Sequence, residues 1–323
     1  MTPLQKQIIN LLQKNGRLSR KSLGEKLNVT AAAMSQNMKL LIADGYIKED
    51  EIIDKGSVGR KEILLRLNDQ KYFFYGIEIE NGLTLTKSNL LGDIDEPISF
   101  ESYCDALHYL KSQKMEECLA ISIAKKGFFT ENNLNNEEKE FLQELKKMVK
   151  DVYFNNNIAC LAYAYKYFHE DEENFMLIKY GPGLGSASFI NNKLLKNDNY
   201  STYELGKLQV NLDGDTLENL IDYESLNVTS ETLLGRFEND KELRTKLIAF
   251  LSLAIKIPNT LLQLDKVIIS GELFQKQENY LALKEELSKD KNFEITKLTN
   301  IENYKSFNRN KCAITAIYLF INN

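Results

Sequence analysis

Cysteine and histidine are scarce in this chain of 323 residues, and their positions do not suit metal binding. The four cysteines are Cys104, Cys118, Cys160 and Cys312, and no two of them have C-x-x-C spacing. The two histidines, His108 and His169, are expected to be surface or core residues rather than ligands. We therefore expect neither a zinc site nor a disulfide framework, and the thiols are expected to stay reduced in a cytosol.

Long hydrophobic runs are also missing. The most apolar stretch, residues 247–255, lies between Lys246 and Lys256 and is too short for a membrane-spanning helix, which needs ~20 residues. Residues 1–7 are polar and lead directly into a helical pattern, unlike a signal peptide. We expect a cytoplasmic protein with no membrane partner.

The chain has no overall excess of positive charge, because its net charge is −5. That value argues against a general nucleic-acid binder. Residues 1–68 nevertheless contain 12 Lys and Arg against 7 Asp and Glu, a net charge of +5, and the remainder carries −10. A basic head on an acidic body is the distribution expected if only the head meets phosphate.

The first 67 residues show the pattern of a winged helix-turn-helix. Residues 3–14 predict a first helix, and apolar residues at helical spacing from Leu23 to Ile42 predict two short helices joined at 28–30. Thr30 can cap the second of these, and Gly45 can end it. Residues 46–53 and 61–67 predict two strands, with residues 54–60 as the wing between them.

The second short helix presents a face suited to DNA. At 100° per residue, Met34 and Met38 point inward while Ala32, Gln36 and Lys39 point outward. Glutamine can bond adenine, alanine can contact a thymine methyl group, and lysine can reach phosphate. The alternative is an ordinary surface helix in a three-helix domain, but the cationic strand-loop-strand that follows favours the winged form. The predicted contacts are Arg17, Ser19, Arg20, Thr30, Ala31, Ala32, Ser35, Gln36, Lys39, Lys55, Ser57, Arg60 and Lys61.

Strands alternate with helices after residue 71, which predicts an α/β body with more than one sheet. Strands are expected at 72–79 and 83–88, with a third beginning near Asp93. Residues 230–264 predict helices, and residues 312–321 predict a closing helix.

Several segments in order resemble the ROK family of bacterial sugar-responsive repressors and sugar kinases, in particular its xylose-repressor and N-acetylglucosamine-repressor branch. They are GRLSR at 16–20, GRK at 59–61, GIEIENGLTLTKSNLLGDI at 76–94, VYFNNNIACLAYAY at 152–165, LIKYGPGLGSASFINNKLL at 177–195, YELGKL at 203–208 and VIISGEL at 267–273. The resemblance implies an actin-like, ribonuclease-H-like body of two lobes. The expected division is a head at 1–70, a first lobe at 71–157 plus 305–323, and a second lobe at 158–304.

The catalytic motifs of the resembled kinases are altered here. Their first phosphate loop reads roughly Asp-x-Gly-Gly-Thr, whereas this chain has Glu80 where the family offers a glycine amide, so a phosphate would be repelled. Their general base is an aspartate, and the matching residue is Asn157, whose amide cannot take a proton near neutral pH. The second phosphate loop, Gly181–Gly185, is better kept, but a glycine-rich turn is as often simple turn geometry as an anion cradle.

The zinc motif of the family is missing as well. Its histidine matches Lys207, and its Cys-x-Cys-Gly-x-x-Gly-Cys run has no counterpart before Glu218. Thiolates and a neutral imidazole are needed there, so we expect no bound metal.

The residues that remain of the family's sugar pocket could hold carbohydrate hydroxyl groups, or they could be relics and solvated carboxylates. They are Asn156, Asn157, Glu204, Glu218, Gly183 and Gly185. We predict a sequence-specific DNA-binding transcriptional regulator that acts as a repressor and has neither catalytic residues nor a cofactor. Its expected partners are double-stranded DNA with an A·T-rich pseudo-palindromic operator, a second copy of itself as a homodimer, and a sugar or sugar phosphate. The alternative is a sugar kinase with an accessory DNA-binding head.

Overall fold

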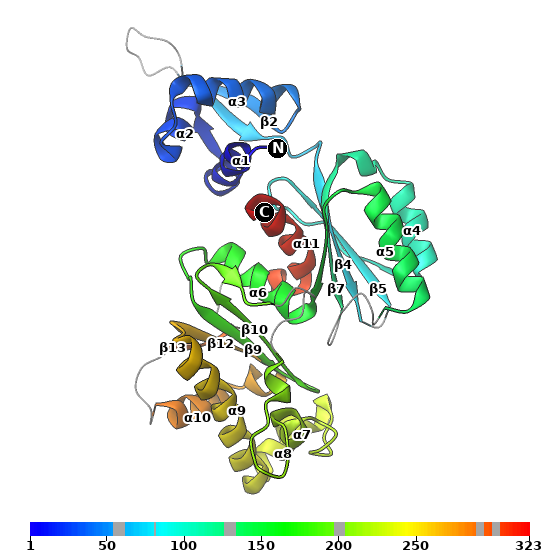
Figure 1. Cartoon of the computed structure of the whole chain (residues 1–323), viewed down its shortest axis with the longest axis vertical. Helices are drawn as coiled ribbons and strands as arrows, with labels where there is room; N and C mark the ends of the chain where they lie inside the picture. Colours follow the sequence, from blue (N-terminus) through cyan, green and yellow to red (C-terminus); the bar gives the residue numbers. More distant parts are fainter. Residues whose placement is uncertain (54–61, 81, 126–133, 197–203, 289–293, 299–303) are drawn as a thin grey trace. The chain divides into compact units, whose positions relative to one another are not determined.

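The computed structural model describes residues 1–53, 62–80, 82–125, 134–196, 204–288, 294–298 and 304–323 (Figure 1). The chain divides into two compact units. The first contains Met1–Lys125, Leu134–Phe154 and Cys312–Asn323, and the second contains Asn155–Lys311. The unit boundaries therefore fall at 154/155 and 311/312, whereas the expected lobe boundaries are 157/158 and 304/305.

The head is a three-helix domain with a small sheet. Its helices are α1 (Pro3–Asn15), α2 (Arg20–Leu27) and α3 (Ala31–Ala43), and its strands are β1 (Arg17–Ser19), β2 (Ile47–Ile53) and β3 (Glu62–Leu67). The antiparallel order is β1-β3-β2, so β3 lies in the middle. The sequence pattern predicts every element except β1. The core of the head is formed by buried apolar residues of its three helices and of β2 and β3: Ile8, Ile9, Leu12, Leu23, Met34, Met38, Leu41, Ile47, Leu65 and Leu67.

The rest of the first unit is a five-stranded mixed sheet in the order β6-β5-β4-β7-β8. Its elements are β4 (Phe73–Ile79), β5 (Leu83–Asn89), β6 (Ile98–Phe100), α4 (Tyr103–Lys111), β7 (Cys118–Lys125), α5 (Asn136–Met148), β8 (Val152–Asn156) and the end of α11 (Tyr304–Asn322). The third strand begins at Ile98 rather than near Asp93, where the chain makes only an isolated bridge between Ser88 and Ile94.

The second unit contains another five-stranded sheet, in the order β11-β10-β9-β12-β13. Its strands are β9 (Phe175–Tyr180), β10 (Leu184–Ile190), β11 (Lys193–Leu194), β12 (Lys266–Gly271) and β13 (Glu294–Lys297). Its helices are α6 (Asn157–Phe168), α7 (Leu217–Ile221), α8 (Ser230–Asn239), α9 (Lys241–Leu262) and α10 (Gln277–Leu287), with short 3₁₀ turns at Leu205–Lys207 and Glu272–Gln275. The helices predicted over 230–264 are α8 and α9, and Asp240 both ends α8 and caps α9. The expected α/β class with more than one sheet is confirmed.

Helix α9 is long and apolar enough, by length and composition, to cross a membrane. One face of it belongs to the core of the second unit, where Leu243, Leu247, Leu251, Ala254 and Ile255 are buried. Such burial is what a core helix of an α/β domain requires.

Gly76 in the central strand β4 lets α11 approach the sheet closely (Figure 1). A Cβ atom at this position would lie 2.1 Å from the Ala313 backbone nitrogen and 2.6 Å from the Cys312 carbonyl carbon. Backbone atoms cannot move aside as a flexible side chain can, so this contact requires glycine.

We predict that Gly76→Ala lowers the free energy of unfolding by about 3 kcal/mol, since α11 must shift away from β4. Gly235→Ala is the matched control, because a Cβ atom there meets nothing within 4 Å and alanine favours the helix α8 by up to ~1 kcal/mol. Thermal unfolding of the full chain measures both. Equal stability of Gly76→Ala and the parent chain would contradict the close packing.

Candidate functional site

The turn between α2 and α3 sets up a helix-turn-helix. Asn28 ends α2 in the left-handed conformation, with φ 52°, and its N–H bonds the end of that helix. Two residues later, the Thr30 side chain accepts the Ala33 N–H at 3.3 Å and caps α3. The two helices are thus joined by a short turn with a defined conformation.

The outward face of α3 is polar, small and free of carboxylates until Asp44. Ala31, Ala32, Ser35, Gln36 and Lys39 are all exposed, which confirms the predicted orientation of this helix. Leu40 is also exposed, at 47%, and lies one turn after Gln36, although it is not among the predicted contact residues. A helix face with one cation, one amide, methyl groups and no negative charge can approach a polyanion and contact base edges.

The residues at β1 and the start of α2 that were predicted as DNA contacts have partners within the head. Ser19 is only 3% exposed, and its hydroxyl caps α2 by accepting the Ser22 N–H. Arg17 makes an ion pair with Asp50 at 2.8 Å, and Arg20 makes one with Glu49 at 2.7 Å. The unpredicted strand β1 buries Ser19 and places both arginines beside carboxylates of β2. Contact of these three residues with DNA stays a prediction.

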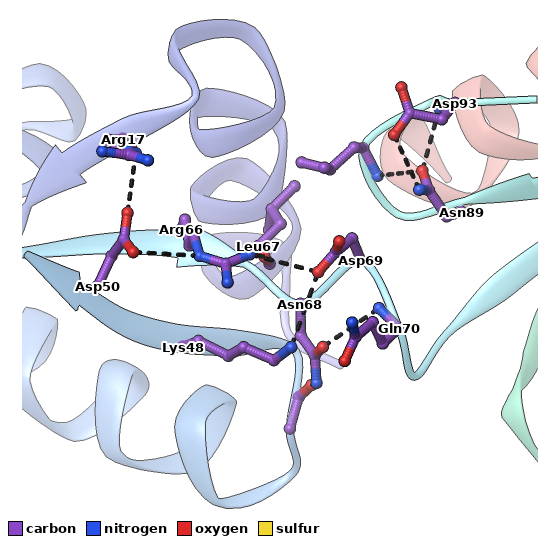
Figure 2. Close-up of polar contacts among 12 residues, drawn as sticks. Arg17, Lys48, Asp50, Arg66, Leu67, Asn68, Asp69, Gln70, Asn89 and Asp93 are labelled. Atoms are coloured by element: carbon purple, nitrogen blue, oxygen red, sulfur yellow. Dashed lines mark hydrogen bonds and ion pairs between the residues drawn. The ribbon is translucent and has the colours of Figure 1, made fainter.

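Asp50 belongs to a charged network that ties the head sheet to the segment after β3 (Figure 2). Arg66 contacts Asp50 at 3.4 Å on one side and Asp69 at 3.3 Å on the other, and Lys48 lies 3.7 Å from Asp69. All of these side chains are partly exposed, so each pair contributes little by itself. Together they fix the course of the chain from β3 toward β4.

That segment is also attached to the end of α3. The Asp44 carbonyl accepts hydrogen bonds from the Lys71 ammonium at 2.5 Å and from the Tyr72 hydroxyl at 2.8 Å. The rings of Tyr46 and Tyr72 stack at 4.1 Å, and burial together with the adjacent Tyr72 raises the pKa of Tyr46. Tyr72 directly precedes β4. Its hydrogen bond to Asp44 therefore connects the C-terminal end of α3 to the start of the central strand of the next sheet.

The predicted wing residues lie outside the described residues: Lys55, Ser57, Arg60 and Lys61. The flanking strands β2 and β3 pair antiparallel as far as Ile53 and Glu62.

In the second unit, Glu218 stands at the centre of the predicted ligand residues. Its Oε2 lies 2.7 Å from the Lys207 ammonium, and a Cβ atom on Gly183 would lie 2.7 Å from its Oε1. The bond to Glu218 raises the pKa of Lys207, and partial burial next to Glu218 raises the pKa of Glu204. The structure therefore brings Glu204, Glu218 and Gly183 together.

The glycines of the second loop are explained by close packing. Glu218 approaches Gly183, and the Ile158 side chain would lie 2.7 Å from a Cβ atom on Gly185. A carboxylate in contact with the loop opposes a second anion there, so these contacts favour turn geometry over a phosphate cradle.

The asparagines have a structural task at the start of α6. Asn156 is buried and its side chain accepts the Ala159 N–H at 2.6 Å, which caps the helix. The preceding Asn155 is 1% exposed, and among the described residues its Nδ2 finds no acceptor. Asn157 is the first residue of α6 and partly exposed, so its amide is the one best placed to meet a ligand.

Two cavities lie near these motifs, one in each unit. The first, of about 260 Å³, is lined by Glu78, Glu80 and Thr84, so two carboxylates stand where a phosphate would have to enter. The second, of about 570 Å³, has mostly apolar walls that include Leu205, Leu208 and Pro258, with Glu204 and Lys207 also lining it. The residues that line the first cavity include no cation, and Lys207 in the second already pairs with Glu218, so both linings are poorly suited to a nucleoside triphosphate.

The comparisons with known proteins cover most of the chain. A model of winged helix-turn-helix DNA-binding domains matches residues 1–48, and the ROK family model matches residues 106–321. The xylose repressor of Staphylococcus xylosus is 27% identical over 234 residues, which are 64% of this chain and 60% of that repressor. The chain thus matches less than two thirds of the length of this relative.

Solved structures share the fold. A ROK family transcriptional regulator, described as a homologue of the E. coli MLC protein, superposes with a TM-score of 0.72 at 17% identity and 98% coverage of both chains. A ROK family protein from Streptococcus pneumoniae in complex with sucrose gives 0.62 at 14% identity, covering 77% of this chain and 98% of that one. A ROK hexokinase from Thermus thermophilus gives 0.60 at 14% identity, covering 76% and 98%. The regulator covers the head as well as the body.

We predict that Thr30→Ala destabilises the head by about 1 kcal/mol, because the Ala33 N–H loses its cap. Thr30→Ser, which keeps the side-chain oxygen, should behave like the parent chain. Hydrogen exchange at the first turn of α3 measures the difference. Equal exchange in Thr30→Ala and Thr30→Ser would show that the cap contributes nothing.

Proposed function

The chain belongs to the ROK family, and from this premise we propose that it is a sequence-specific DNA-binding transcriptional regulator, a repressor with a non-catalytic body. The observation that carries the proposal is the outward face of α3, which is exposed, bears Gln36 and Lys39, and has no carboxylate before Asp44. This face lies in a winged helix-turn-helix, whose second helix enters a major groove. The protein would act in the cytoplasm.

The proposed DNA contacts divide into base-reading and phosphate-binding groups. Gln36 would bond a base edge, with Ala31, Ala32 and Ser35 close to neighbouring bases. Lys39 and the Thr30 region would contact phosphate. The wing cations Lys55, Arg60 and Lys61, with Ser57, would contact phosphate or a minor groove, which favours an A·T-rich site. A homodimer would place two heads on a pseudo-palindromic operator.

The body would respond to a small molecule rather than transform it. Asn157 cannot act as a general base, and the loss of such a base removes ~10²–10⁴ in rate. Glu78 and Glu80 oppose phosphate at the first loop, as Glu218 does at the second. Asn157, Glu204 and Glu218 can still exchange hydrogen bonds with hydroxyl groups. A sugar or sugar phosphate is therefore the proposed effector class; the S. xylosus relative is named for xylose.

The Asp44 carbonyl offers a route from body to head. A movement of β4 would pull on Tyr72 and Lys71, which both donate to the carbonyl of Asp44, the C-cap of α3. Helix α3 would then change its tilt or its stability, and an effector that prefers one state would shift the equilibrium by its difference in affinity. If the pocket binds nothing, the same attachment makes the body a fixed dimerisation scaffold.

We predict that Gln36→Ala relaxes selectivity at one position of each half-site by about 1–3 kcal/mol. Lys39→Ala should weaken binding to every sequence. It should also reduce the slope of log K against log salt concentration by about 1, because one phosphate contact is lost. Selection from a random duplex library, followed by binding at several salt concentrations, measures both. Lys139→Ala, an exposed lysine of α5 far along the chain from the head, is the control and should change nothing. Unchanged binding in both α3 variants would exclude this helix as the reader.

We predict no phosphoryl transfer from ATP to any hexose, N-acetylhexosamine or pentose in a coupled assay of the full chain. The same sugars and their phosphates, tested by thermal shift, should include one that stabilises the protein if the body is a sensor. Asn157→Asp is the matched variant, and it should stay inactive because the phosphate loop is altered too. Sugar-dependent ATP turnover by the parent chain would favour a kinase with an accessory head.

A further inference from the structure

Residues 207–218 of the second unit form a hairpin whose two arms are paired along their length. The Leu217 N–H donates to the Leu208 carbonyl at 2.9 Å, and the Val210 N–H donates to the Asp215 carbonyl at 2.9 Å. Gln209 and Thr216 form an antiparallel bridge between these bonds. The turn is closed by Asn211 and Asp215, which exchange two further hydrogen bonds of 2.8 and 3.0 Å.

An ion pair closes the open end of the hairpin. The Lys207 ammonium, at the end of the 3₁₀ turn Leu205–Lys207, lies 2.7 Å from Oε2 of Glu218 in the first turn of α7. The other oxygen of the same carboxylate faces Gly183, where an added Cβ would lie 2.7 Å from Oε1. One carboxylate thus connects the hairpin to the loop between β9 and β10.

The resembled family holds this segment with a zinc ion, and the residues here do not fit one. A lysine ammonium has no free lone pair for a metal, and no cysteine occurs between Gly206 and Glu218. Among the described residues, no group of three or more His, Cys, Asp or Glu side chains is arranged to hold a metal ion. The donor set excludes the structural zinc.

We propose that the Lys207–Glu218 ion pair, together with the paired arms of the hairpin, replaces the zinc as the clasp of this segment. The clasp makes the segment independent of metal, and it makes Lys207 a positioning residue that turns Glu218 toward Gly183. Its effect on stability is modest, because the Lys207 side chain is 66% exposed. Its effect on local opening is specific to the hairpin.

The first experiment measures metal dependence of the full chain. Protein purified from zinc-supplemented medium should contain far less than one zinc ion per chain, as measured by inductively coupled plasma mass spectrometry. Its midpoint of thermal unfolding should be the same with and without EDTA. One zinc per chain, or a midpoint lowered by the chelator, would overturn the proposal.

The second experiment measures the clasp by hydrogen–deuterium exchange. In Lys207→Met, the amides of Val210, Asp215 and Leu217 should exchange about two- to fivefold faster than in the parent chain. Lys207→Arg should retain most of the protection from exchange. In 1 M NaCl, the difference in exchange rate between Lys207→Met and the parent chain should become smaller. Lys276→Met is the control, because it removes the ion pair of Lys276 with Glu238 elsewhere in the same unit.

Unchanged exchange in Lys207→Met, or equal acceleration in Lys276→Met, would show that Lys207 is not the clasp. Neither experiment depends on DNA. The role of Glu218 in effector binding belongs to the proposed function, so failure of the clasp and failure of the regulator are distinguishable.

Discussion

The carbonyl of Asp44 is the acceptor on which the proposed coupling of head and body depends. It lies at the end of α3, where a helix leaves its last carbonyls without internal partners. Lys71 and Tyr72 each donate a hydrogen bond to it. Tyr46, two residues after Asp44, stacks its ring on that of Tyr72. The same few residues therefore end the helix proposed to contact DNA and begin the central strand of the first body sheet. In the proposed coupling, a change in the orientation of this helix is transmitted to β4 through these contacts.

The body keeps the family fold while changing the charge at the sites of chemistry. Glu78 and Glu80 replace an anion-binding loop with an anionic surface, and Glu218 occupies the side of Gly183. Lys207 supplies positive charge where a metal would be expected, but it uses that charge on one carboxylate. These changes support the proposal that the body neither transfers phosphoryl groups nor binds zinc, while its Asn and Glu side chains offer hydrogen bonds to hydroxyl groups. They agree with a protein whose output is DNA occupancy.

Local pattern predicted most elements and the orientation of α3, because helical spacing and caps are properties of neighbouring residues. Met34 and Met38 are buried and Gln36 and Lys39 exposed, as their spacing requires. The errors arose where distant residues meet. Strand β1 exists because Arg17–Ser19 pairs with Leu64–Arg66, and that pairing buried Ser19 and placed Arg17 beside Asp50. Likewise, the sequence shows Lys207 only as a residue that stands where the family has a zinc ligand. Its ion pair with Glu218 could not be predicted, because the hairpin brings the two residues together.

The most direct test of the central claim is recovery of the DNA bound to this protein in its own cells, by crosslinking and sequencing. The account predicts a small number of enriched fragments that share two inverted half-sites about one helical turn, or a multiple of it, apart. The enrichment should be lost in a chain that carries Gln36→Ala and Lys39→Ala together. Recovery of no common sequence, or unchanged enrichment in the double variant, would contradict the assignment of α3 as the DNA-reading element.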